Sequence, residues 1–274
     1  MVRIREGNGL GTVVCFHAIG GMISSYGSLF REVPAGFALY GVESPRNPET
    51  IQQHAGIEAL ASYYVGLIEA LQPVYPLVLG GWCVGADLAL NLQDKLDRRG
   101  IPVAVAFGLD ANLDFSVRKV MQQCREKGSE DVWRFFTKIM AGPEFIDELF
   151  ASSDFLKADK VGRVERVYKA RDGHPDRSHI KRDLVNPTWQ FDFIDELLDA
   201  SRHYRFQGNR SNSKILLFSD ASDKHFVLRE AINVDAPALE LAFYDTSHRG
   251  LLEYPHIKHI VARVIDTIEL TAAE

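Results

Sequence analysis

The sequence has few cysteines and no long apolar run. Its 274 residues include three cysteines, Cys15, Cys83 and Cys124. An odd and sparse set of cysteines argues against a disulfide scaffold and is typical of a reducing compartment, so a cytoplasmic protein is expected. No run of about 18 apolar residues is present, which predicts no membrane-spanning helix. The first residues, Met1 to Arg5, are not followed by the apolar region of a signal peptide.

The sequence also has no excess of positive charge. Its 31 lysines and arginines are outnumbered by 37 aspartates and glutamates, giving a net charge of −6. This balance gives no electrostatic case for binding nucleic acid. Metal-ligand spacings, internal repeats and low-complexity segments are absent too, so no metal is expected. A hydrophobic content of 46% supports a sizeable core, and the length fits one α/β domain or a domain with an insertion.

One stretch, Gly81-Trp82-Cys83-Val84-Gly85, organises the chain. A short apolar run, 75–79, precedes it and predicts a buried strand, while 87–96 has helical periodicity. A strand, a glycine turn and a helix with a nucleophile-type residue at the apex form the pattern of a nucleophile elbow. The glycines allow close approach and a strained apex, and the helix N-terminus favours a thiolate. The alternative is a buried structural cysteine in an ordinary turn.

Strands and helices alternate in the two ends of the sequence. The alternation predicts a mostly parallel sheet flanked by helices on both faces. The expected strands are 12–16, 37–42, 75–79, 103–109, 214–218 and 239–244, and the expected flanking helices are 24–33, 57–71, 87–96 and 257–270.

The middle of the chain contains no strong strand pattern. It has four helical segments rich in aromatic and charged residues, 132–140, 145–150, 161–170 and 189–204. A separate helical domain is disfavoured because strands resume afterwards. The sequence therefore predicts an α/β core over 1–112 and 213–274, and a helical lid inserted at 113–212.

A glycine pair, Gly20-Gly21, follows the strand at 12–16. In α/β-hydrolases the corresponding loop supplies one backbone N–H to the oxyanion hole, and the residue after the nucleophile supplies the other. We therefore expect the N–H groups of Ile19 and Val84 to be these donors. The alternative is a tight turn without that role. His17 precedes the turn and is interpreted as shaping the loop, not as a base.

Three residues in the order nucleophile, acid, histidine each follow a predicted strand. Cys83 would be the nucleophile, His248 the general base, and Asp110 the carboxylate that orients the imidazole. Open α/β sheets place their sites at the carboxyl ends of strands. Asp220 and Asp223, after the strand at 214–218, are the alternative acids. Two further aspartates are interpreted as solvated loop carboxylates, Asp114 and Asp245.

Four segments together resemble the carboxy-terminal (type I) thioesterase domains of nonribosomal peptide and polyketide synthases. They are 16–21, 75–85, 109–111 and 247–252. The resemblance implies an α/β-hydrolase fold with a helical lid. It also implies an acyl or peptidyl chain received from the phosphopantetheine arm of a carrier protein, the expected partner, with no cofactor bound by the chain itself.

The sequence departs from that family at two positions. Cys83 stands where serine is usual, and Ala86 stands where another glycine is usual. With cysteine the acyl intermediate becomes a thioester, which is more activated toward oxygen and nitrogen nucleophiles than an ester. In its cysteine at the elbow, the chain resembles the members of this family that close strained rings such as β-lactones or β-lactams. Release by cyclisation is therefore expected in preference to hydrolysis.

Two other functions fit the same residues. The first is a stand-alone editing (type II) thioesterase that hydrolyses misacylated carrier proteins, a reading that an acid at Asp220 or Asp223 would favour. The second is a non-catalytic binding module with the hydrolase fold, in which Cys83 is inert. Reaction of Cys83 with a thiol alkylator distinguishes this second alternative from the enzymes.

Overall fold

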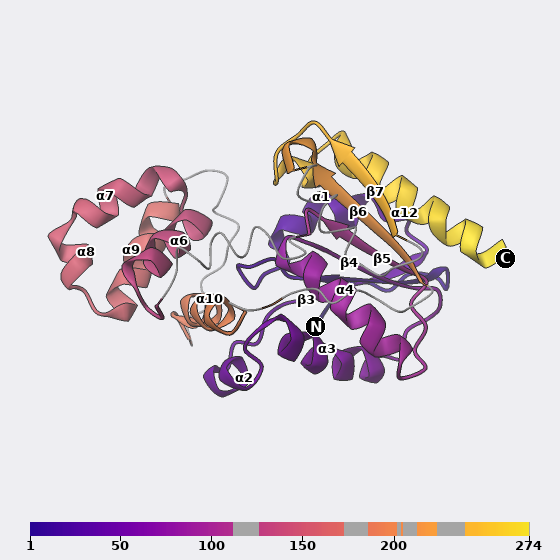
Figure 1. The fold of residues 1–274 in the computed structure, drawn as a ribbon, viewed down its shortest axis with the longest axis horizontal. Coiled ribbons are helices and arrows are strands. Elements are labelled where there is room, and N and C mark those ends of the chain that lie inside the picture. The colour runs from indigo at the N-terminus through magenta and orange to yellow at the C-terminus, as the bar shows by residue number, and fades with distance from the viewer. Residues whose placement is uncertain (112–125, 173–185, 202–203, 205–212, 224–238, 274) are drawn as a thin grey trace. The chain divides into compact units, whose positions relative to one another are not determined.

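The computed structural model describes residues 1–111, 126–172, 186–201, 204, 213–223 and 239–273. Within them lies a seven-stranded sheet with the order β1-β3-β2-β4-β5-β6-β7 (Figure 1). Neighbouring strands are parallel except β1 and β3, which are antiparallel. The predicted mostly parallel sheet is therefore confirmed. Its strands are β1 (Val2–Arg5), β2 (Gly11–Phe16), β3 (Phe37–Val42), β4 (Leu77–Trp82), β5 (Val105–Leu109), β6 (Lys214–Asp220) and β7 (Leu239–Tyr244).

The sequence did not predict β1, and it ended β4 too early. β1 is a largely exposed edge strand without an apolar run, and Arg5 anchors it by donating to the carbonyls of Val33 and Pro34 at 3.0 and 2.7 Å. β4 continues through its two glycines because both neighbouring strands pair with it there. Gly80 lies under the ring of Phe107, where any Cβ would sit 2.0 Å from the ring. Tertiary pairing therefore outweighs the low strand propensity of glycine.

Helices cover both faces of the sheet (Figure 1). α3 (Ile57–Leu71) and α4 (Val84–Asp97) pack together on one face, while α1 (Gly27–Glu32) and α12 (His256–Ala273) pack together on the other. One face of α3 is buried, including Leu60, Tyr64 and Ile68. Both faces of the central strands are thus buried under helices, which explains why the sequences of these strands are continuous apolar runs. Two short 3₁₀ helices contact α1 and α12, namely η1 (Ser24–Tyr26) and η5 (Gly250–Leu252). A third, η4 (Ala221–Asp223), follows β6.

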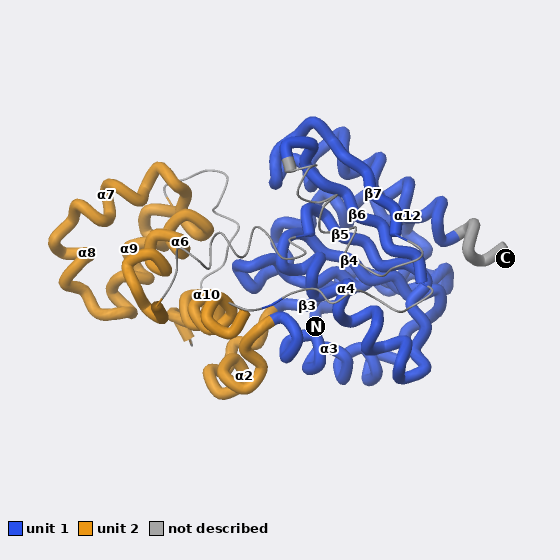
Figure 2. The backbone as a smooth tube through the Cα atoms, viewed as in Figure 1, with its two compact units in different colours: residues 1–43, 57–116, 204–274 blue, residues 44–56, 117–203 orange. Residues whose placement is uncertain are grey.

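The chain forms two compact units (Figure 2). Unit 1 comprises 1–43, 57–116 and 204–274, and contains the sheet; unit 2 comprises 44–56 and 117–203. Unit 2 contains the helices α2 (Pro48–Gln53), α6 (Glu130–Met140), α7 (Ile146–Ala151), α8 (Ser153–Lys157), α9 (Lys160–Asp172) and α10 (Trp189–Ala200), with η2 (Pro143–Phe145). Residues 44–56, which the sequence assigned to the core, group with unit 2. The division into a catalytic core and a lid stays a prediction, because compactness alone does not define a lid.

Unit 2 has an aromatic core of its own. The indole of Trp133 stacks on Phe191 with ring centroids 3.8 Å apart, and Phe136 meets Phe191 edge-on at 5.4 Å. Trp189 and Phe193 are also buried. Most of the aromatic residues of this segment therefore stabilise unit 2 itself. Phe135 and Phe145, by contrast, are only partly buried.

Candidate active site

Cys83 lies at the apex of the turn between β4 and α4. Its backbone has φ 57° and ψ −127°, a region that residues other than glycine rarely adopt. The N–H of Cys83 donates to the carbonyl of Leu109 at 2.9 Å, and its carbonyl accepts from Ala86 at 2.9 Å. Such a backbone costs about 1–3 kcal/mol and persists where the surroundings determine it. The strain lifts a partly exposed thiol out of the strand–helix turn, as a nucleophile elbow requires.

The two elbow glycines have separate packing reasons. A Cβ on Gly81 would lie 2.1 Å from the carbonyl carbon of Gly85, so the strand and the first turn of α4 touch through their backbones. A Cβ on Gly85 would lie 2.2 Å from the carbonyl oxygen of Phe16 and 2.8 Å from that of His17. The start of α4 therefore lies directly against the loop that follows β2.

Asp110 and His248 are brought together from the ends of β5 and β7. The Nδ1–H of His248 donates to Oδ2 of Asp110, which is only 8% exposed. Asp110 also has a left-handed φ of 50°, and its N–H donates to the carbonyl of Phe218 at 2.7 Å. With Nδ1 engaged by the carboxylate, Nε2 is the nitrogen left for the hydrogen bond of His248 with Cys83.

These contacts favour the protonated form of His248. Burial by itself lowers the pKa of the imidazole, but hydrogen bonds and charge interactions with Asp110 and Cys83 outweigh burial and raise it to about 10. The side chain is 46% exposed, so solvent weakens the effect of burial. At neutral pH these contacts therefore favour an imidazolium between the carboxylate and the sulfur.

Sequence reasoning missed two residues that hold this arrangement. The indole N–H of Trp82 donates to the carbonyl of His248 at 2.8 Å, and the two rings lie 4.6 Å apart. The hydroxyl of Tyr26 accepts from the N–H of Trp82 at 2.8 Å and donates to the carbonyl of Phe16 at 2.6 Å. The position of Trp82 directly before the apex was the available sequence signal. No periodicity marked Tyr26 as more than a core residue.

The expected oxyanion donors belong to the start of α4 and to the loop after β2. Val84 is the first residue of α4, and the first four N–H groups of a helix have no partner within it. Ile19 is in the loop after β2, which packs against the start of α4. The oxyanion role of both N–H groups stays a prediction.

The alternative acids are placed differently. Oδ1 of Asp220 accepts from the N–H of Ser222 at 2.9 Å, and so it caps the turn after β6. Asp245 is exposed, as expected for a loop carboxylate. The side chain of Asp223 and the whole of Asp114 are outside the described residues. The observed partner of the His248 imidazole is therefore Asp110.

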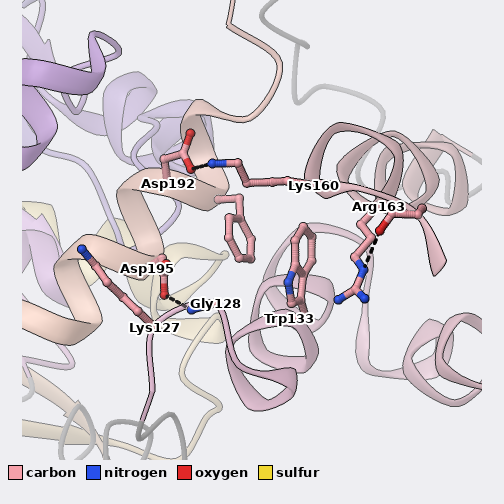
Figure 3. A pocket seen from close by; sticks show the side chains of 9 residues that line it. Lys127, Gly128, Trp133, Lys160, Arg163, Asp192 and Asp195 are labelled. Atoms are coloured by element: carbon pink, nitrogen blue, oxygen red, sulfur yellow. Dashed lines mark hydrogen bonds and ion pairs between the residues drawn. The ribbon is translucent and has the colours of Figure 1, made fainter. Parts of the chain in front are cut away.

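A separate open pocket of about 360 Å³ lies within unit 2. Figure 3 shows its charged rim, where Lys160 pairs with Asp192 at 2.8 Å and the N–H of Gly128 donates to Asp195 at 2.9 Å. Trp133 and Phe191 contribute its apolar wall. The cations and carboxylates of its rim largely neutralise one another. All its lining residues belong to unit 2, whereas Cys83, Asp110 and His248 belong to unit 1.

The fold and the site together define the class. A mostly parallel sheet, a strained elbow between a strand and a helix, and a histidine after the last strand are the features of an α/β-hydrolase. The family model described as "Thioesterase domain" matches residues 11–229. The chain belongs to this family.

Several of the curated proteins that the chain resembles are large synthases. The chain is 31% identical over 110 residues to enterobactin synthase component F of Escherichia coli (strain K12), a match covering 40% of this chain and 8% of that protein. It is 26% identical over 154 residues to orsellinic acid synthase of Emericella nidulans, covering 56% of this chain and 6% of that protein. The chain thus spans less than a tenth of the length of these relatives.

Solved structures share the fold across nearly the whole chain. A four-domain nonribosomal peptide synthetase bound to AMP and glycine matches with a TM-score of 0.75 at 18% identity, covering 97% of this chain and 20% of that one. The NocB thioesterase domain, in covalent complex with a fluorophosphonate nocardicin G analog, matches with a TM-score of 0.59 at 16% identity, covering 95% and 96%. At these identities the likeness shows the α/β-hydrolase fold alone. Among the described helices, none has the length and apolarity needed to cross a bilayer.

Proposed function

We propose that this thioesterase domain takes an acyl or peptidyl chain from the phosphopantetheine arm of a carrier protein onto Cys83, and releases it by intramolecular cyclisation or otherwise by hydrolysis. The observation that carries the proposal is the hydrogen bond of His248 to Asp110, beside a strained elbow that holds Cys83. A buried structural cysteine would need neither the partly exposed thiol nor the carboxylate-bound histidine. The synthase context of the relatives supports the carrier protein as the donor.

The acylation step begins with the sulfur of Cys83. Its thiolate attacks the carbonyl carbon of the carrier thioester, a carbon–sulfur bond forms, and an electron pair moves onto the carbonyl oxygen. The N–H groups of Ile19 and Val84 would stabilise that oxyanion. The intermediate then collapses, the bond to the phosphopantetheine sulfur breaks, and His248 gives its proton to the departing sulfur. The products are the acyl thioester of Cys83 and a neutral histidine.

The release step uses the same histidine as a base. Acylation removes the hydrogen bond and the charge interaction with the Cys83 sulfur, which together with those of Asp110 raise the pKa of His248. The neutral form of the His248 imidazole is then more populated at neutral pH. It accepts the proton of a hydroxyl or amine on the chain, or of water. The oxygen or nitrogen attacks the thioester carbon, and the bond to Cys83 breaks. The thiolate and imidazolium of the resting state are thereby restored.

The choice of cysteine bears on the product. A thioester retains more of the reactivity of the carrier-bound chain than the ester that a serine would form. An internal nucleophile of the substrate can therefore attack it even where the new ring is strained, as in a β-lactone or a β-lactam. This chemistry favours cyclisation as the function of Cys83.

Unit 2 is proposed to act as a lid over the acyl-enzyme. Water competes with any internal nucleophile, and exclusion of water is a recognised role of lids. The partly buried Phe135 and Phe145 are the candidates to line an apolar acyl channel, because the buried aromatics are already used in the core of the unit.

Three experiments test the proposed function. Iodoacetamide should alkylate Cys83 faster than Cys15, which is completely buried; equal inertness would favour a binding module. Cys83→Ala should abolish release from a peptidyl carrier protein, and undiminished turnover would contradict the proposal. Comparing peptidyl with acetyl carrier thioesters then separates chain release from editing, because an editing enzyme should prefer the acetyl substrate.

A further inference from the structure

A fully buried histidine lies at the end of β2, directly before the glycine loop. His17 is 0% exposed, and its two ring nitrogens each have a partner. Nδ1 lies 2.8 Å from the carbonyl oxygen of Ala18, and Nε2 lies 2.7 Å from the hydroxyl of Tyr64, on α3. The proposed mechanism uses neither group.

The chemistry of these partners fixes the tautomer of His17. A carbonyl oxygen only accepts, so Nδ1 must carry the hydrogen that is donated to Ala18. Burial lowers the pKa of His17 to about 4, although the hydrogen bond with Ala18 opposes this, and the ring is therefore neutral at physiological pH. In a neutral ring Nε2 accepts, so the hydroxyl of Tyr64 donates to it. The Ala18 carbonyl thus fixes the proton on Nδ1, and the hydroxyl of Tyr64 satisfies Nε2 and holds the ring.

The carbonyl of Ala18 belongs to the same peptide unit as the N–H of Ile19. This peptide bond is trans, so the carbonyl and the N–H point in opposite directions in one plane. The carbonyl oxygen accepts from Nδ1 of His17 and also from the N–H of Gly21 at 2.9 Å. Two donors therefore hold the carbonyl toward the protein interior, and the N–H of Ile19 must point away from them.

We propose that His17, held by Tyr64, is a positioning residue that orients the N–H of Ile19 as an oxyanion donor. The inference rests on the proposed acyl transfer by Cys83. The backbone supports it, since the carbonyl of His17 lies where a Cβ on Gly85 would clash, which places this loop beside the elbow. A glycine-containing loop can rotate its peptide planes at little cost, so an external anchor is required to keep one plane fixed.

A matched pair of substitutions separates positioning from packing. In His17→Asn the side-chain amide can occupy the place of Nδ1 and donate to the Ala18 carbonyl. In His17→Gln the amide reaches only the place of Nε2, so contact with Tyr64 survives without the Nδ1 donor. Loss of a complete oxyanion donor costs about a hundredfold to a thousandfold in turnover. We expect His17→Gln to lower kcat by about tenfold to a hundredfold with little change in KM, and His17→Asn to recover most of that loss.

The decisive readout is the carbonyl of the acyl-enzyme. Cys83 is acylated with a carbon-13-labelled p-nitrophenyl octanoate, intact mass confirms one acyl group, and difference infrared spectroscopy records the carbonyl stretch. The stretch should lie below that of a free thioester in the wild type and in His17→Asn, and rise toward the free value in His17→Gln. A carbonyl stretch at the wild-type value in a folded His17→Gln protein would overturn the inference. Absence of any acyl group on wild-type Cys83 would instead contradict the proposed function.

A second variant covers the case in which His17→Gln does not fold. Tyr64→Phe removes one hydroxyl and leaves the ring packing, so Nε2 loses its donor. The imidazole then keeps only one of its two ring hydrogen bonds, and its donation to the Ala18 carbonyl becomes less well oriented. A carbonyl stretch between those of the wild type and the free thioester is expected, and a wild-type stretch would overturn the role given to Tyr64 and His17.

Discussion

The indole N–H of Trp82 donates to the carbonyl of His248, so the residue before Cys83 anchors the histidine whose imidazole hydrogen-bonds with Cys83. The two segments are 166 residues apart in sequence. The ring of Trp82 also lies 4.6 Å from the imidazole. One side chain therefore fixes both the backbone of the histidine loop and one side of the imidazole.

Trp82→Phe should uncouple these two contacts. Phenylalanine keeps a ring beside the imidazole but has no N–H for the His248 carbonyl. A neutral hydrogen bond is worth about 0.5–1.5 kcal/mol, which corresponds to a fall in kcat of roughly twofold to tenfold. Steady-state kinetics with a carrier-bound substrate measure the change, and Trp82→Ala, which loses both contacts, should be slower still. Equal rates for wild type and both variants would remove Trp82 from the site.

Asp110→Asn should be far more harmful than Asp220→Asn. Replacing the orienting carboxylate of a triad can lower turnover by about ten-thousandfold, because the imidazole loses its tautomer preference. Asp220 caps the turn after β6, so its amide variant is expected to stay near the wild-type rate. Both variants replace an aspartate by asparagine, so Asp220→Asn is the matched control for Asp110→Asn. The reverse order of effects would move the acid to β6 and favour an editing thioesterase.

His248 should remain protonated well above neutral pH in the free enzyme. Its pKa is raised to about 10 from the ordinary 6.5, since the interactions with Asp110 and Cys83 outweigh burial. Imidazole resonances in nuclear magnetic resonance should therefore show no titration of His248 between about pH 6 and pH 8. Asp110→Asn should bring the midpoint down, and acylation of Cys83 should do the same. A wild-type midpoint near 6.5 would contradict the ion-pair resting state.

The same shift has a consequence for folding stability. A histidine whose pKa is raised in the folded state contributes stability that is complete below about pH 6.5 and declines as pH rises through about 10. The difference in unfolding free energy between wild type and His248→Gln should follow this course. A difference that grows with rising pH would have the wrong sign.

If unit 2 acts as a lid, its partly buried aromatic side chains should influence the ratio of cyclised to hydrolysed product. Phe135→Ala and Phe145→Ala remove apolar surface from unit 2 without emptying its aromatic core. If these rings keep water from the acyl-enzyme, hydrolysed product should increase relative to cyclised product while acylation of Cys83 stays near normal. Product ratios by chromatography and acylation by intact mass measure the two effects. An unchanged ratio in both variants would assign unit 2 to packing or carrier docking.

Sequence patterns predicted the parallel sheet and the elbow because both leave local signatures. Apolar runs mark strands buried on both faces, and the spacing of Gly81 and Gly85 around Cys83 marks a backbone contact. The exposed edge strand β1 was missed because its pairing with β3 is decided by tertiary contacts. α2 was not predicted, although Asn47 caps it by accepting from the N–H groups of Glu49 and Thr50. That capping signal was available and was overlooked.

The positions of supporting groups were harder to predict. Nothing in the sequence pairs Trp82 with His248 or His17 with Tyr64, because these contacts join segments that only the completed fold brings together. The left-handed backbone of Asp110 was not predicted either, and its N–H donates to the carbonyl of Phe218 on the neighbouring strand β6. Residue type identified the candidates, and only the structure showed which of them meet.

The most direct test of the account is the mass of the protein after brief reaction with a peptidyl carrier protein. An adduct of the acyl chain alone is expected, and tryptic mapping should locate it on Cys83. Cys83→Ala should give no adduct, and Cys83→Ser should give an ester that partitions more toward hydrolysis or persists. Product release without any adduct on Cys83, or release at the wild-type rate by Cys83→Ala, would contradict the account.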